Sequence, residues 1–238
     1  MTITDQKPAH NDRAPEDRAQ IIREHFRNAI IERRLAPGTK LSESEVGGLF
    51  DVSRTVVRSA LQMLALEGLV RSERNRGAFV ATPSPEEARQ IFAARRLVEP
   101  GMAAAACDRV DPADIAALKR HLRGEASLMT ERGPSARRAE IRASGEFHLL
   151  LASVAGNDIL YRFLEELTAR SSLVIALYGR SGASSCGHDE HESIVVALEA
   201  GNAQRAAKLM LQHIDHIEAD LDLRLTEGLP LSEALHLP

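Results

Sequence analysis

The chain has 238 residues, of which 44% are hydrophobic and 27% are charged, proportions that are typical of globular domains and argue against a wholly disordered chain. No apolar run approaches the roughly 18 residues of a membrane span, so we expect no membrane partner. Cys107 and Cys186 are isolated, without a disulfide-rich pattern, which favours a cytoplasmic protein. Aromatic residues make up only 3% of the chain, which argues against the binding of single-stranded nucleic acid by base stacking.

The formal net charge of −4 would by itself argue against a DNA-binding protein, but the charge is unevenly distributed. Residues 16–82 carry 11 basic and 9 acidic side chains, whereas residues 83–238 carry 17 basic and 23 acidic ones. The basic excess is concentrated between residues 53 and 76. Because charge asymmetry of this kind separates a nucleic-acid surface from the rest of a protein, the sequence predicts a basic N-terminal part that faces DNA.

In chain order, residues 1–15 are polar and contain two prolines without any periodicity, so we expect a disordered arm. From Glu16, apolar residues at helical spacing predict a helix that stops at the LAPG segment of residues 35–38. Ser42, with Glu45 three residues later, predicts a capping box at the start of a short second helix.

Ser53 is a good N-cap for a third helix, which Gly68 would end. Short apolar runs at residues 69–71 and 78–80, joined by a polar segment that contains glycine, predict the two strands of a hairpin. A helix, a helix-turn-helix and a hairpin in succession are the plan of a winged helix-turn-helix. We therefore predict that residues 16–82 form a DNA-binding domain of this class.

Two prolines near residue 84 predict a linker, which we place at residues 83–86. We expect residues 87–226 to form an all-helical domain, an antiparallel bundle, and residues 227–238 to form a C-terminal tail. The predicted fold is thus mainly α, with a winged helix-turn-helix followed by a helical bundle. Its six helices are expected near residues 85–108, 111–132, 136–155, 158–179, 188–200 and 202–226.

Candidate DNA-reading residues lie at the start of the third helix. Arg54, Thr55 and Arg58 share a face turned away from most of the apolar stripe, where a guanidinium can reach guanine or a phosphate. Hydroxyl groups and amides at the helix N-terminus take phosphate oxygens. The alternative is that these arginines form an ordinary solvated surface. With the wing included, the predicted DNA-binding residues are Ser53, Arg54, Thr55, Arg58, Arg76 and Gly77.

The segments PGTKLSESEV, VSRTVVRSAL, LEGLV and RGAFV resemble the GntR family of bacterial transcription regulators over about residues 17–82. The resemblance implies that the helix residues Arg54, Thr55 and Arg58 and the wing pair Arg76-Gly77 contact operator DNA. The sequence departs from the family pattern at Val56, where proline is common, and at Ser59, where glutamate is common. Loss of that glutamate changes how Arg58 would be held.

Three of the nine histidines, His148, His191 and His213, lie on the apolar faces of three different predicted helices. Buried imidazoles need polar partners, and three of them can converge on a divalent metal. The alternative is that each is a core histidine with its own local hydrogen bond.

Four segments, RRLVEP, FHLLLASVAGN, EHESIVVALEAGN and MLQH, resemble the FCD effector domain of the FadR-type branch of the family. The resemblance implies that the three histidines bind a metal, zinc in the first place and otherwise manganese or nickel. The acidic residue that the family places four positions before His148 is Ser144 here. We expect an effector carboxylate, or a water held by Ser144, to complete the shell. Arg95 matches an arginine of the effector pocket; its alternative is an ion pair with Glu99.

These observations predict a metabolite-responsive repressor. Two copies would form a homodimer, bind a palindromic operator in double-stranded DNA and release it when a small organic acid binds near the metal. One alternative is a metal-dependent hydrolase that uses the three histidines, with Glu146, Glu190 or Glu192 as its base. Another is a DNA-binding regulator whose histidines are only structural. We favour the repressor, because a hydrolase gives no reason for the basic N-terminal domain. A repressor has no catalytic residues, so none are predicted.

Overall fold

A computed structural model describes residues 15–131, 133–180 and 186–224. The expected arm over residues 1–15, apart from its last residue, and the expected tail over residues 227–238 lie outside the described residues. The elements in chain order are α1 (Pro15–Ile31), β1 (Lys40–Leu41), α2 (Glu43–Phe50), α3 (Arg54–Leu66), β2 (Val70–Glu73), β3 (Gly77–Val80), α4 (Pro85–Cys107), α5 (Pro112–Met129), α6 (Pro134–Ala155), α7 (Asp158–Tyr178), α8 (Cys186–Glu199) and α9 (Ala203–Ala219).

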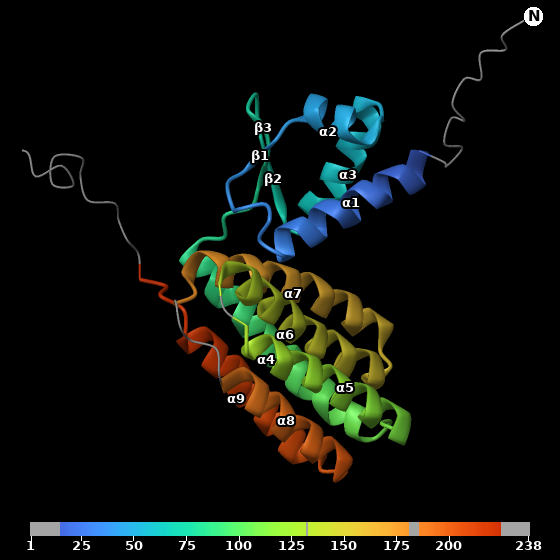
Figure 1. Ribbon diagram of the computed structural model, residues 1–238, viewed down its shortest axis with the longest axis vertical. Coiled ribbons are helices and arrows are strands. Elements are labelled where there is room, and N and C mark those ends of the chain that lie inside the picture. The colour runs from blue at the N-terminus through green and yellow to red at the C-terminus, as the bar shows by residue number, and fades with distance from the viewer. Residues whose placement is uncertain (1–14, 132, 181–185, 225–238) are drawn as a thin grey trace, which may run out of the picture.

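The N-terminal elements form the predicted winged helix-turn-helix, which stands at one end of the helical bundle (Figure 1). Strands β2 and β3 form the expected antiparallel hairpin, and β1 adds a third strand that the sequence did not predict. At two residues, β1 is too short to show the alternation that identifies a strand. It pairs with β3 through Lys40 and Phe79, so the segment before α2 is anchored to the wing.

Helix α3 begins as predicted, because the Ser53 side chain accepts a hydrogen bond from the Val56 amide. The capping box predicted at Ser42 is wrong. Ser42 is the N-cap of α2, but its side chain makes no capping hydrogen bond. Its hydroxyl instead lies 3.0 Å from that of Ser44. The capping pattern considers only the residues at the N-cap and three positions later, so it did not take account of the hydroxyl group of Ser44.

The six C-terminal helices pack around a common apolar core, and α4 lies against both α6 and α9. Five of them keep close to their predicted bounds, whereas α9 ends at Ala219 rather than near residue 226. The chain turns there because Asp220 caps the helix and Leu221 pairs with Gly179 after α7. Within the described ranges, no helix is both long enough and apolar enough to cross a membrane.

Helix α7 also belongs to the N-terminal core. It contacts α1, from which it diverges in Figure 1, and its buried Ala169 and Leu173 pack among the apolar residues of the winged helix-turn-helix. The buried residues of that core are Ala19, Ile22, Phe26, Ile30, Leu41, Val46, Val57, Ala60, Leu61, Leu64, Leu69, Val70, Ala78 and Val80, together with these two from α7.

Candidate metal centre and nucleic-acid interface

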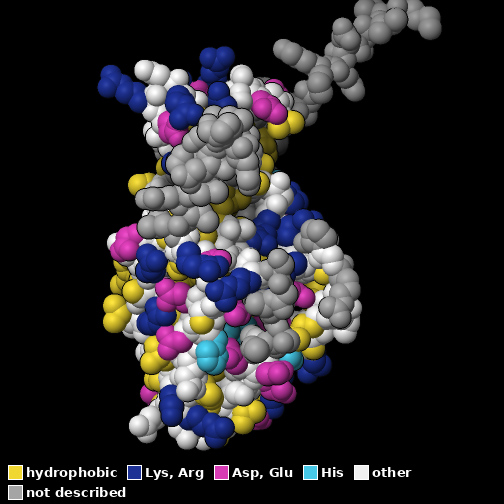
Figure 2. Space-filling model, turned by 90° about the vertical axis from the view of Figure 1, so that its left-hand side faces the viewer, with side chains coloured by type: hydrophobic (Ala, Val, Ile, Leu, Met, Phe, Trp, Pro, Cys, Tyr) yellow, Lys and Arg dark blue, Asp and Glu magenta, His cyan; other side chains and the backbone are white. Residues whose placement is uncertain are grey.

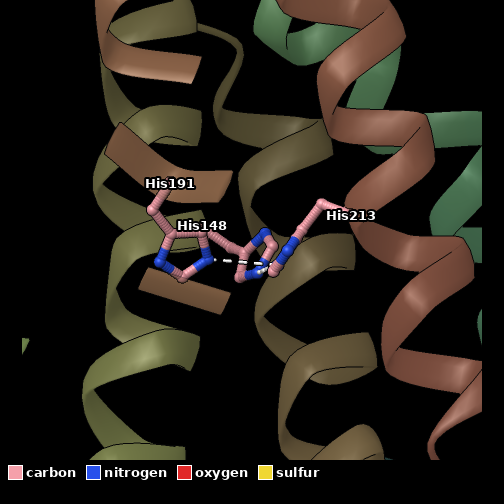
Figure 3. A group of neighbouring side chains, drawn as sticks. All are labelled: His148, His191 and His213. Atoms are coloured by element: carbon pink, nitrogen blue, oxygen red, sulfur yellow. Dashed lines mark hydrogen bonds between the residues drawn. The ribbon is translucent and has the colours of Figure 1, made fainter. Parts of the chain in front are cut away.

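Three helices bring His148, His191 and His213 together in the interior of the bundle (Figure 3). The Nε2 atom of His213 lies 3.1 Å from Nε2 of His191 and 3.2 Å from Nε2 of His148. Each histidine is only 1% exposed, because each lies on the apolar face of its own helix: α6, α8 and α9 respectively. The apolar spacing of those helices therefore directs three nitrogen atoms to one point.

Each of the three rings has a carboxylate at its other nitrogen atom. Glu125 Oε2 of α5 lies 3.0 Å from Nδ1 of His191, and Glu190 Oε2 lies 2.7 Å from Nδ1 of His213. Glu99 of α4 contacts Nδ1 of His148 in the interior, although the contact lacks the alignment of a regular hydrogen bond. A carboxylate at Nδ1 favours a proton there and leaves the Nε2 lone pair directed at the centre of the cluster.

Burial is the largest influence on these histidines, and it lowers the pKa of each to about 4 despite the neighbouring carboxylates. Burial acts in the opposite direction on Glu125 and raises its pKa. Contacts with His121 and His191 outweigh that effect and hold the pKa of the Glu125 carboxyl well below its usual range. The result is a set of neutral imidazoles inside a ring of ionised carboxylates, which is the protonation state that metal ligation requires.

The cluster fits a divalent metal. Two imidazole nitrogens bound to zinc at about 2.05 Å with a tetrahedral angle are about 3.3 Å apart, close to the 3.1 and 3.2 Å seen here. The Nε2 atoms of the three histidines would be the ligands, and Glu99, Glu125 and Glu190 would orient them from outside, as outer carboxylates do in protein metal sites. The three protein ligands are all nitrogen atoms. Imidazole nitrogen suits zinc and nickel better than manganese, which prefers oxygen ligands.

A cavity of about 140 Å³ opens beside the cluster, so that two of its histidines, His191 and His213, form part of the wall. Histidine side chains reach the surface of the bundle between acidic ones in Figure 2. Ser144, the position expected to hold a water or an effector, also lines the cavity. Further wall residues are Glu125, Met129, Arg137, Glu140, Ile141, Ile175, Gly179, Arg180, Gly187, His188, Glu190, His216, Ile217, Asp220 and Leu221.

Arg95, the other residue expected to bind the effector, is buried and does not belong to the wall of this cavity. Its Nε donates to Glu99 one turn later, which is the ion pair that we considered as the alternative. Arg95 Nη2 is buried and has no hydrogen-bond partner among the described residues. Arg95 therefore reaches the cluster through Glu99, and its contact with an effector remains a prediction.

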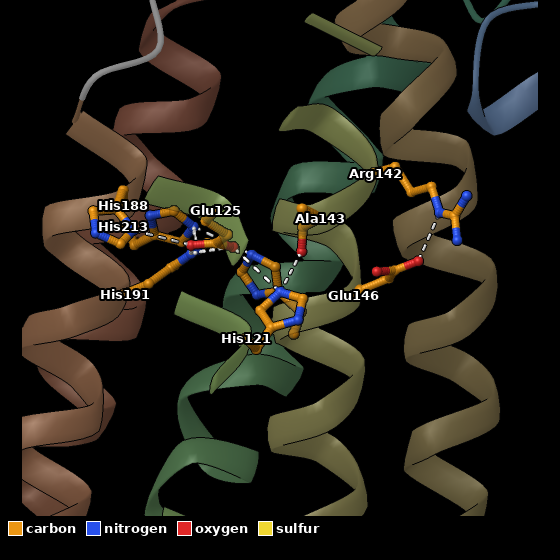
Figure 4. Close-up of polar contacts among 9 residues, drawn as sticks. His121, Glu125, Arg142, Ala143, Glu146, His188, His191 and His213 are labelled. Carbon is orange, nitrogen blue, oxygen red and sulfur yellow. Dashed lines mark hydrogen bonds and ion pairs between the residues drawn. The ribbon is translucent and has the colours of Figure 1, made fainter. Parts of the chain in front are cut away.

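Sequence reasoning missed Glu99 and Glu125 as partners of the histidines, and considered Glu190 only as a hydrolase base. Their signal was present, because Glu99 lies between the buried Arg95 and Met102 on one face of α4. Glu125 follows the buried Leu118 and Leu122 on α5 in the same way. An acidic residue on the buried face of a helix needs a partner. Figure 4 shows Glu125 among His121, His188 and His191, whereas Glu146 points away and pairs with Arg142.

The predicted DNA-binding residues lie at the start of α3 and in the turn of the wing. Ser53, Arg54, Thr55, Arg58, Arg76 and Gly77 are all exposed. Figure 2 shows Lys and Arg side chains projecting from the N-terminal part, whereas the visible face of the bundle mixes both charges. Gly77 has a positive φ of 99°, a backbone conformation that favours glycine in the turn of the wing.

Arg58 is held by a partner from another helix. Its Nε lies 2.9 Å from both carboxylate oxygens of Glu43, at the start of α2. The family pattern has a glutamate at the position of Ser59, next to Arg58. In this chain, Arg58 pairs instead with a glutamate of the preceding helix, α2. In the wing, Arg76 pairs with Glu73 and lies 5.5 Å above the ring of Phe79.

An exposed, capped helix and a basic wing, carried by a helical bundle with a buried histidine cluster, are the features of a DNA-binding regulator. Comparison with known proteins agrees. Residues 18–80 match the family model "Bacterial regulatory proteins, gntR family", and residues 90–216 match the model "FCD domain". The chain belongs to the GntR family, in the branch that carries an FCD domain. It is a DNA-binding transcription regulator and not an enzyme, so the hydrolase alternative is set aside.

Individual relatives support the same class. The chain is 30% identical over 203 residues to the "Uxu operon regulator" of Haemophilus influenzae, covering 77% of this chain and 74% of that one. It is 28% identical to the "HTH-type transcriptional repressor RspR" of Escherichia coli, over 81% of this chain and 83% of that one. A crystal structure of a GntR-type regulator from Rhodococcus matches with a TM-score of 0.74 and 26% identity, over 85% of this chain and 96% of that one.

Proposed function

We propose that this protein is a metal-dependent repressor that a small organic acid releases from its operator. The observation that carries the proposal is the buried cluster of His148, His191 and His213 beside an open cavity, in a chain that also carries a DNA-reading head. We take residues 16–82 as the head and the helices from α4 to α9 as the sensing domain, so that of the linker predicted at residues 83–86 only Pro83 and Ser84 precede the helix. Repression is favoured because RspR, a relative, is named a repressor.

The sensing site would consist of a zinc ion, or a manganese or nickel ion, held by the three Nε2 atoms. Three protein ligands leave at least one position open, as in open zinc sites, and a bound metal would act there as a Lewis acid toward an oxygen ligand. The carboxylate of an organic acid fits this position, next to Ser144. Arg180 and Arg137, the latter paired with Glu140, line the cavity and provide positive charge for the rest of an acidic molecule. The buried Arg95 stabilises the carboxylate of Glu99 behind His148.

A homodimer would present two recognition helices to the two halves of a palindromic operator. An apolar surface suited to this lies on α4 and α7, where Leu97 is 84% exposed, Ile159 is 65% exposed and Phe163 is 57% exposed. Apolar side chains of this size, gathered on two neighbouring helices, mark an interaction surface more often than a free one. We assign the surface to a second copy of this chain, because an operator with two-fold symmetry requires two heads.

The test combines operator selection with metal analysis. The purified protein is used to select duplex DNA from a random pool, and its affinity for the selected operator is measured by fluorescence anisotropy with and without a panel of organic acids. Metal content is measured in parallel for the protein and for His191→Ala, with the exposed His25→Ala as the control. We expect about one metal per chain, lost in His191→Ala and kept in the control, and at least one acid that weakens operator binding. Stoichiometric metal in His191→Ala, or no effect of any acid, would contradict the proposal.

A further inference from the structure

The recognition helix α3 is attached at its C-terminal end to the sensing domain. Arg170 of α7 donates from its Nε to the backbone carbonyl of Glu67, the residue that caps α3, at a distance of 3.0 Å. The guanidinium lies directly over Gly68, so that a Cβ atom added at Gly68 would come within 2.2 Å of it. Gly68 also has a positive φ of 73°, so both the backbone turn and the close approach of Arg170 require glycine there.

The side chain of Glu67 reinforces the same junction. It is 7% exposed, and its carboxylate pairs with Arg23 and Arg27 of α1. Arg27 continues to α7, where its Nη2 lies 3.2 Å from both the backbone carbonyl and the carboxylate of Glu165. Partly buried ion pairs of this kind resist screening by salt better than exposed ones. Helices α1, α3 and α7 therefore share one network of charged hydrogen bonds.

A second attachment lies one and a half turns further along α7. Arg33, which follows α1, donates from Nη2 to the carbonyl of Ile175 at 2.6 Å. Leu173, between the two attachments, and Ala169, next to Arg170, are buried in the core of the head. Two hydrogen-bonded points with an apolar contact between them fix an orientation, whereas a single point would act as a pivot.

We propose that Arg170 and Arg33 are positioning residues that fix the reading head on α7 and thereby set the operator spacing that the dimer accepts. Neither residue belongs to the predicted DNA-contacting set or to the histidine cluster. In a dimer, the position of each head on its own bundle determines the distance and the rotation between the two recognition helices. One added base pair between half-sites shifts them by about 3.4 Å and rotates them by about 35°, so a rigidly held pair of heads discriminates strongly against altered spacing.

This inference rests on the proposed function, and the experiment separates the two. Operators selected by the full-length protein are resynthesised with one or two base pairs added or removed between the half-sites, and affinities are measured for the protein and for Arg170→Ala. The matched control is Arg123→Ala, because Arg123 is an exposed arginine of α5, which carries no residue of the apolar surface assigned to the second copy. Thermal melting and metal content confirm that each variant is folded.

The parent protein and Arg123→Ala are expected to lose at least tenfold in affinity for each base pair of altered spacing. Arg170→Ala is expected to flatten this profile to within about threefold, with weaker binding at the optimal spacing. Arg33→Ala, which breaks the second attachment, provides an independent test if Arg170→Ala does not fold, and the same flattening is expected. A steep profile in the folded variants, or a flat one in the parent protein, would overturn the inference. Failure of the parent protein to select any operator would instead refute the proposed function.

Discussion

Glu125 holds His191 from the side of the ring that faces away from the cluster. Glu125 Oε2 lies 3.0 Å from Nδ1 of His191, whose Nε2 in turn lies 3.1 Å from that of His213. The carboxylate thus directs the proton of His191 to Nδ1 and its lone pair to the cluster. Because the same carboxylate contacts His121 and His188, it connects the wall of the cavity to the interior.

Removal of Glu125 is expected to weaken metal binding without removing a ligand. Outer carboxylates of this kind contribute about 10–100-fold to metal affinity, so Glu125→Ala should bind zinc that much more weakly in a titration against a competing chelator. Glu146→Ala is the matched control, because Glu146 is exposed and pairs with Arg142 instead of a histidine. Equal zinc affinity in the two variants would show that the Glu125 contact has no part in the metal site.

Arg58 is expected to contribute to the reading of bases. Arg58→Ala should weaken operator binding by about 1–3 kcal/mol, and specificity should relax at one base position, if the guanidinium contacts a guanine. Competition between operators that differ at single positions provides the measurement. A uniform loss across all sequences would mean that Arg58 contacts only phosphates.

Glu43 is expected to affect specificity through Arg58. Glu43→Gln removes a negative charge near the DNA and the ion pair at Arg58 Nε, so binding to random DNA should strengthen while the ratio of specific to nonspecific affinity falls. In the background of Arg58→Ala, the same substitution should leave that ratio unchanged. A full and equal effect in both backgrounds would show that Glu43 acts by charge alone.

The metal-free protein is expected to lose stability in mild acid. Each cluster histidine has its pKa lowered to about 4 in the folded state, against about 6.5 when unfolded. The unfolded chain therefore binds more protons between these values, and the free energy of unfolding should fall as the pH decreases from about 6.5 toward 4. Urea unfolding of chelator-treated protein across this range measures the effect. An unchanged midpoint would contradict the buried, neutral state of the histidines.

Sequence periodicity was sufficient to predict the winged helix-turn-helix, the order of the helices and the placement of each of the three histidines on an apolar face, whereas their convergence on one site was implied by the family resemblance. These features depend on apolar spacing and on caps such as Ser53, which act locally. It failed for β1, whose two residues are held by pairing with β3, and for Ser42, whose hydroxyl has a competing partner in Ser44.

Contacts between distant elements could not be predicted in the same way. The pairing of Glu43 with Arg58 and that of Glu125 with His191 each join two helices, and no spacing along one helix encodes them. The ion pair of Arg95 with Glu99 lies within one helix and was anticipated as an alternative. Its connection to His148 became visible only when α4 and α6 were placed together.

We propose that an organic acid regulates DNA binding through a metal ion bound by the three histidines. The most direct test measures operator affinity for the metal-loaded protein, with and without an acid that weakens binding, and repeats it for His191→Ala. The acid is expected to weaken operator binding at least tenfold in the metal-loaded protein and to have no effect on the metal-free variant, which still binds the operator. An equal response to the acid in His191→Ala would contradict the proposal.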